Sequence, residues 1–116
     1  MIGEISLPWP SRYLHPNARV HWSRKAFATS RSRWDADIAT RAAGISKLDL
    51  ASLKATIVFH PPDKRRRDLD GMLSSCKAYL DGISDAIGID DSAWEIAIRR
   101  DEPVKNGAVK VILEIV

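Results

Sequence analysis

Apolar and polar residues alternate in four segments of the chain, and this pattern predicts β-strands. The predicted strands cover residues 5–7, 53–59, 94–99 and 108–116. Pro8 and Pro10 stop the first strand, and Pro61 and Pro62 stop the second, because proline cannot continue a strand ladder. Asn106-Gly107 lies between the last two strands and predicts that they form a hairpin.

Apolar residues at helical spacing predict two helices between these strands. The first runs from about Lys25 to Ala43, with Gly44 as its C-cap. Its expected buried side holds Phe27, Trp34, Ile38 and Ala42. The second runs over residues 69–87 and ends at Gly88, with Cys76 on its apolar stripe. A neighbouring stripe of this helix carries Asp70, Ser74, Lys77 and Asp81.

These elements predict an α+β fold, a small β-α-β-α-β-β domain with a mixed sheet and a C-terminal hairpin. The length of 116 residues fits a single domain over residues 1–116. The last strand is apolar on both faces, since Ala108, Ile112 and Val116 alternate with Val109 and Val111. Both faces should therefore be covered, which favours a homodimer.

Composition indicates a globular domain, since hydrophobic residues make up 45% of the chain and charged residues 28%. Cys76 is the only cysteine, so no disulfide forms within the chain and a reducing cytoplasm is the expected setting. No apolar run approaches the roughly 18 residues that a membrane span needs. We therefore expect no membrane partner.

The net charge is only +3, but the charges are unevenly distributed. Between Arg12 and Trp34 there are basic residues and no acidic ones, whereas acids gather between Asp63 and Glu102. A basic arm beside an acidic pocket is typical of nucleases, although an ordinary basic face gives the same pattern. The basic residues of this arm are Arg12, Arg19, Arg24, Lys25, Arg31 and Arg33.

The segment Lys64-Arg65-Arg66-Arg67 runs directly into Asp68 and Asp70. The cations attract a polyanion, and paired carboxylates attract a hard divalent metal ion. Together they predict a site that binds a phosphodiester and cuts it. The structural alternative is a solvated turn in which Asp68 caps the helix and Asp70 interacts with the helix dipole.

The chain resembles the RusA family of Holliday junction resolvases at three places. These are Arg65-Arg66-Arg67-Asp68-Leu69-Asp70, Lys77-Ala78-Tyr79-Leu80-Asp81-Gly82-Ile83 and Gly88-Ile89-Asp90-Asp91. Leu7-Pro8-Trp9-Pro10 is similar to the family's opening strand and turn. The resemblance implies a homodimeric, Mg²⁺-dependent endonuclease that resolves four-way DNA junctions by paired symmetric nicks, in recombination and repair.

The resemblance also implies roles for individual residues. Asp68, Asp70 and Asp91 correspond to the essential carboxylates and would hold the Mg²⁺, and Lys77 is the best match for the catalytic lysine. The charge pattern, rather than the resemblance, predicts the residues that contact the DNA backbone, which are Lys64, Arg65, Arg66 and Arg67, with Arg12, Arg19, Arg24 and Lys25. The sequence departs from the family pattern twice. Gly71 replaces an asparagine, and Lys77 lies seven rather than four residues after Asp70.

The expected helix raises a geometric difficulty for this site. Its 18 or so residues would extend about 27 Å, so one chain does not readily bring both ends to a single metal. Either the Asp90-Asp91 turn folds back along the helix, or a second subunit supplies it. The alternatives to a nuclease are a branched-DNA-binding protein that does not cut and a basic nucleic-acid-binding regulator.

Some further residues carry weaker signals. His15, His21 and His60 lack metal-ligand spacing, so we expect structural roles for them. We expect Trp34 and Trp94 to lie in the core, and Trp9 and Trp22 either to stack on DNA or to be structural.

Overall fold

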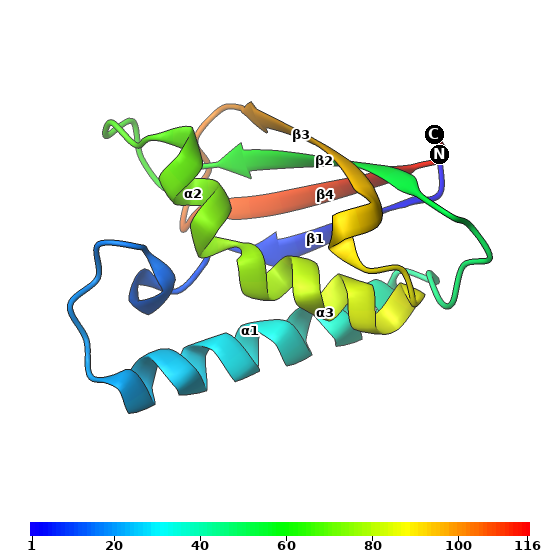
Figure 1. Ribbon diagram of the computed structural model, residues 1–116. Coiled ribbons are helices and arrows are strands. Elements are labelled where there is room, and N and C mark those ends of the chain that lie inside the picture. Colours follow the sequence, from blue (N-terminus) through cyan, green and yellow to red (C-terminus); the bar gives the residue numbers. More distant parts are fainter.

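A four-stranded mixed sheet forms the centre of the structure, a computed structural model that describes residues 1–116 (Figure 1). The strands are β1 (Gly3–Pro8), β2 (Leu53–His60), β3 (Trp94–Arg100) and β4 (Ala108–Glu114). Their order in the sheet is β1-β4-β2-β3, with β2 and β3 parallel and the other neighbours antiparallel. The predicted α+β class, mixed sheet and order of strands along the chain are confirmed.

The predicted C-terminal hairpin is wrong, because β3 and β4 lie on opposite sides of β2. After β3 the chain runs past the C-terminal end of β2. There the backbone N–H groups of Asp101 and Val104 donate hydrogen bonds to the carbonyls of Phe59 and Pro61. It crosses that end and turns at Asn106-Gly107, both at positive φ. The apolar β4 thereby reaches the middle of the sheet, and the charged β3 takes an edge.

Three helices cover one face of this sheet: α1 (Trp22–Ala42), α2 (Leu69–Ser75) and α3 (Lys77–Ile87). Beneath them lie the completely buried side chains of Leu53, Ile57 and Phe59 from β2 and Leu113 from β4. Two short 3₁₀ turns, η1 (Arg12–Leu14) and η2 (Asp91–Ala93), interrupt the connecting loops. No helix is both long and apolar enough to cross a membrane.

The buried side of α1 differs from the predicted one. Phe27, Trp34 and Ile38 are 71%, 58% and 44% exposed, and the helix instead buries Ala28, Ser32, Ala36 and Thr40. Small residues face inward because α1 and α3 approach closely. A Cβ placed on Gly82 of α3 would lie 2.0 Å from the carbonyl oxygen of Arg33. The prediction of Trp34 as a core residue is wrong, whereas Trp94 is buried as expected.

The single helix predicted over residues 69–87 is also wrong, since it divides at Cys76 into α2 and α3. The N–H of Cys76 bonds to the carbonyl of Leu73, three residues back, and Ser75 Oγ donates to the carbonyl of Gly71 at 2.9 Å. Serine bonds of this kind bend helices. Cys76 itself is buried in the core, as predicted, and burial raises the pKa of its thiol to about 12.

The far face of the sheet is less well covered than the sequence indicated. In β4, Ala108 and Ile112 are half-buried, while Val116 beyond the strand is 68% exposed. A single chain therefore buries one face of the sheet fully and leaves apolar surface on the other.

Candidate nuclease site

A cavity of about 670 Å³ lies between the loop that follows β1 and the first turns of α2. The β1 loop contributes residues 9–12 and 15–17, and the other wall comes from residues 65–68 and from α2. The loop after β1 thus forms one of the two walls of the cavity. The cavity is strongly polar, and its charged lining residues are Arg12, Arg65, Arg66, Arg67, Asp68 and Asp70.

Asp68 occupies the N-cap position of α2 without acting as a side-chain cap. Its carbonyl accepts the N–H of Met72 at 3.1 Å, but its carboxylate makes no hydrogen bond to the helix. The neighbouring Arg65 and Arg67 pair with Asp63 rather than with Asp68. The sequence left open a capping role for the Asp68 side chain, and the structure shows no such cap. Its carboxylate is therefore available at the cavity wall.

Asp70 lies in the first turn of α2 and lines the same cavity. Its Oδ1 accepts a hydrogen bond of 2.9 Å from the N–H of Gly71. The remaining carboxylate oxygen has no partner in the chain, so the two aspartates of the Asp-x-Asp segment present acceptor oxygens to one space. Carboxylate oxygens are the ligands that Mg²⁺ prefers, and one or two of them commonly suffice beside water and phosphate.

The basic segment divides into exposed arginines and one that is held in place. Arg67 is only 15% exposed at its side chain, bonds Asp63 at 2.8 Å and lies 5.7 Å from the centre of the Trp9 ring. Arg65 is 77% exposed and 4.0 Å from Asp63. Hydrogen bonds, first from Arg67 and then from the backbone of Arg65, lower the pKa of Asp63 to about 2. Arg67 thus fixes the loop, and Arg65 is free to bind an anion.

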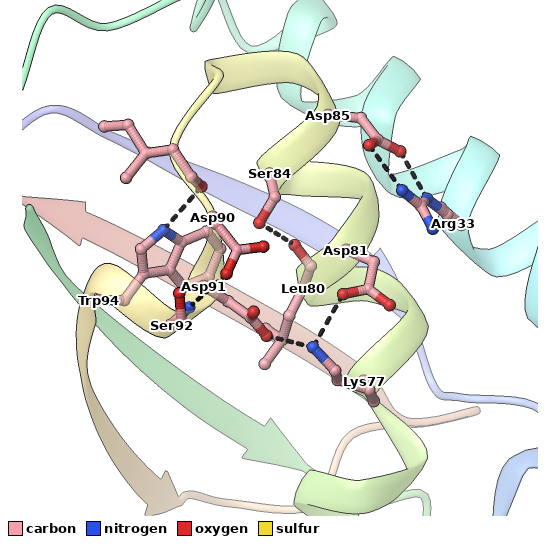
Figure 2. Close-up of polar contacts among 11 residues, drawn as sticks. Arg33, Lys77, Leu80, Asp81, Ser84, Asp85, Asp90, Asp91, Ser92 and Trp94 are labelled. Carbon is pink, nitrogen blue, oxygen red and sulfur yellow. Dashed lines mark hydrogen bonds and ion pairs between the residues drawn. The ribbon is translucent and has the colours of Figure 1, made fainter.

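Lys77, the first residue of α3, forms a second charged cluster with Asp81 and Asp91 (Figure 2). Its Nζ donates to Asp81 Oδ1 at 2.9 Å and to Asp91 Oδ2 at 2.5 Å. Hydrogen bonds to Asp91 and then to Asp81 raise the pKa of the ammonium group. The chain after α3 therefore folds back along the helix as far as Lys77, but not as far as Asp68 and Asp70 at the start of α2. The geometric difficulty that the sequence raised is thus not resolved within one chain.

The carboxylates predicted to bind metal are only partly assembled in this chain. Asp68 and Asp70 share the cavity, whereas Asp91 does not line it and is paired with Lys77. No three side chains among the histidines, cysteines, aspartates and glutamates come close enough together to hold one metal ion. Ser74 lines the cavity and Lys77 does not, because the helix breaks between them.

The predicted basic arm continues from the cavity along the β1 loop. Arg12, Arg19 and Arg24 line a shallower depression of about 430 Å³ next to it, and Lys25 and Lys64 are exposed. The guanidinium of Arg12 lies 5.2 Å from the centre of the Tyr13 ring, and its hydrogen bond lowers the pKa of that phenol. Cationic side chains thus extend outward from the cavity, as a phosphate backbone would require.

The sequence left open whether Trp9 and Trp22 stack on DNA, and the two side chains differ in burial. Trp9 packs edge-on against Phe59 at 6.3 Å and supports Arg67, so it is part of the cavity wall. Trp22 is 75% exposed at the start of α1.

Each of the three histidines makes a hydrogen bond within the protein. His21 caps α1, and His60 bonds the carbonyl of Glu102. His15 lines the cavity beside Gly71, which the sequence gave no reason to expect because the two residues are far apart in the chain.

Comparison with known proteins identifies a relative but no activity. No family model matches the chain. An uncharacterized protein of Xylella fastidiosa (strain Temecula1 / ATCC 700964) is 48% identical over 111 residues, which cover 93% of this chain and 72% of the relative. The chain belongs to the same family as that protein.

Proposed function

We propose that this protein is a metal-dependent endonuclease of the RusA type that cuts four-way DNA junctions. The observation that carries the proposal is the cavity in which Asp68 and Asp70 present unpaired carboxylate oxygens next to Arg12 and Arg65. A site that only positioned a helix would use the Asp68 carboxylate as a cap. Anion-binding cations beside carboxylates that bind a divalent metal are what phosphodiester hydrolysis requires.

Asp68 and Asp70 would hold Mg²⁺ at the cavity wall, and the bound ion would polarise the phosphate and lower the pKa of an attacking water. The exposed arginines would bind phosphates of the DNA backbone and position the strand without reading its sequence. Lys77 would offset negative charge that develops at the phosphate in the transition state, with Asp91 holding its ammonium group.

The proposed assembly is a homodimer, because the two cutting points of a four-way junction are related by two-fold symmetry. Phe27, Trp34 and Ile38 support it, since large apolar side chains exposed on one helix commonly mark a protein interface. Light scattering should give twice the chain mass of 12.9 kDa at micromolar concentration. A mass near 13 kDa would contradict the dimer. The proposed compartment is a reducing cytoplasm, as the single free cysteine suggests.

The function is tested with a synthetic four-way junction and a linear duplex of equal length, each incubated with and without Mg²⁺. We expect paired nicks in the junction only, and only with Mg²⁺. Asp70→Asn should abolish nicking while junction binding is kept or strengthened, because the change removes a ligand charge and also repulsion toward phosphate. Equal nicking by the variant would contradict the assignment of this site, and the same test applies to Asp68. Asp91→Asn instead tests whether Asp91 holds Lys77 in place.

A branched-DNA-binding protein that does not cut is the second candidate. It is favoured by the position of Lys77, which lies outside the cavity and is engaged by two carboxylates. Tight junction binding without nicking at any Mg²⁺ concentration would identify it. Equal affinity for the junction and the duplex at fixed salt would instead indicate a general nucleic-acid-binding regulator.

A further inference from the structure

His15 lies in the proposed site with one ring nitrogen satisfied and the other free. Its Nδ1 accepts a hydrogen bond of 3.1 Å from the backbone N–H of Asn17. A nitrogen that accepts carries no proton, so in the neutral ring the proton is on Nε2, which is therefore a donor. No group of the protein accepts a hydrogen bond from Nε2, and His15 lines the cavity shared by Asp68, Asp70 and Arg65.

The position of the ring depends on the absence of a side chain at residue 71. A Cβ built on Gly71 would lie 3.2 Å from His15 Nε2, closer than ordinary van der Waals contact allows. Apart from the glycine, its chain neighbours and the surrounding helix backbone, the three atoms nearest to that point all belong to the His15 ring. The N–H of the same glycine bonds Asp70 Oδ1, so a metal-binding carboxylate and the imidazole flank a single residue.

We propose that His15 is a substrate-binding residue that donates a hydrogen bond from Nε2 to a phosphate oxygen of the DNA strand in this cavity, and that Gly71 makes room for its ring. The proposal rests on the proposed function, because it takes the ligand of the cavity to be DNA. Phosphate oxygens accept such bonds strongly because they are charged. This proposal also explains why residue 71 is a glycine here. The imidazole of His15 occupies the space that a side chain at residue 71 would need.

The first test compares the affinity of the full-length wild type and His15→Ala for a fluorescent four-way junction, by anisotropy, over a range of salt concentrations. We expect affinity to fall about tenfold, the usual effect of losing one hydrogen bond to a charged group. The log–log salt slope should stay unchanged, because a neutral donor releases no counterions. His15→Gln, whose amide nitrogen can replace Nε2, should recover most of the affinity. His60→Ala, a histidine outside the cavity, should bind as the wild type does.

The second test asks whether Gly71 acts through His15. Gly71→Ala should weaken binding in the wild type and should have no further effect in His15→Ala, because contacting residues are not additive. Equal costs in both backgrounds, wild-type affinity of His15→Ala, or a shallower salt slope for that variant would each overturn the proposal. If the wild type binds the junction but never cuts it, the nuclease function fails, and the binding data still decide the role of His15.

Discussion

Replacing Lys77 by alanine removes the cation that lies between Asp81 and Asp91. If Lys77 acts on the transition state, loss of this preorganised charge should slow junction cleavage on the order of 10²-fold. Junction affinity should change little, because the negative charge that Lys77 would offset develops only in the transition state. The expected result is thus a fall in single-turnover cleavage rate at nearly constant binding.

The structure predicts that this variant stays folded. The side chain of Lys77 is 58% exposed, and exposed ion pairs contribute about 0–1 kcal/mol each. The variant loses two such pairs, which together contribute about 0–2 kcal/mol, and we place the whole loss of stability near 1 kcal/mol because Asp91, only 16% exposed, loses its partner. A loss of this size lowers Tm by roughly 4 °C in a domain of this length. Such a shift is too small to explain a hundredfold loss of rate at 25 °C.

Arg41→Ala is the matched control, because it removes an exposed pair with Asp37 at 2.7 Å on the outer helix α1. It should cost similar or less stability and leave cleavage unchanged. Ser74→Lys, which places an ammonium group in the cavity wall, should partly rescue Lys77→Ala. If Lys77→Ala and Arg41→Ala both cut at the wild-type rate, the catalytic role of Lys77 is refuted. The positive charge at the transition state must then come from the arginines or from a partner subunit.

Four further substitutions test the fold and the cavity. Gly82→Ala should destabilise the protein by about 1–3 kcal/mol in urea unfolding, since its Cβ would lie 2.0 Å from the Arg33 carbonyl oxygen; unchanged stability would refute this close helix contact. The depressed pKa of Asp63 means that its bonds with Arg67 stabilise the fold above pH 4 and are lost as pH falls toward 2. In Asp63→Asn, the free energy of unfolding should therefore fall less between pH 4 and pH 2 than in the wild type. An equal fall in both proteins would contradict this prediction. Arg65→Ala should reduce the log–log salt slope of DNA binding by about 0.9, whereas Arg67→Ala should mainly lower Tm, and the reverse pattern would exchange their roles.

The elements that the sequence predicted well are those specified by neighbouring residues. Pro61 and Pro62 end β2, and Gly88 ends α3 in the left-handed region at φ 77°. The alternation in β2 gave its buried face correctly. Such signals act within a few residues, so they can be read without knowing which segments meet.

The errors concern choices that depend on distant segments. Asn106-Gly107 does form a turn, but turn chemistry does not determine which strand lies beside β4. In α1 the large apolar residues predicted the wrong buried side, because the close approach of Gly82 admits only small residues there. Neither the glycine nor the contact is visible from the periodicity of α1 alone.

The candidate site combines both kinds of information. Asp68 and Asp70 were identified from adjacent residues, and they do share a cavity. Lys77 would lie on the same face as Asp70 in one continuous helix, but the helix breaks at Cys76 between them. Lys77 nevertheless contacts Asp91, the other distant residue that the family resemblance implied. Helical spacing could not have predicted this contact, because it depends on how the chain folds after α3. Because the two side chains are in contact, a double-mutant cycle with Lys77→Ala and Asp91→Asn measures most directly whether they act as one unit in cleavage.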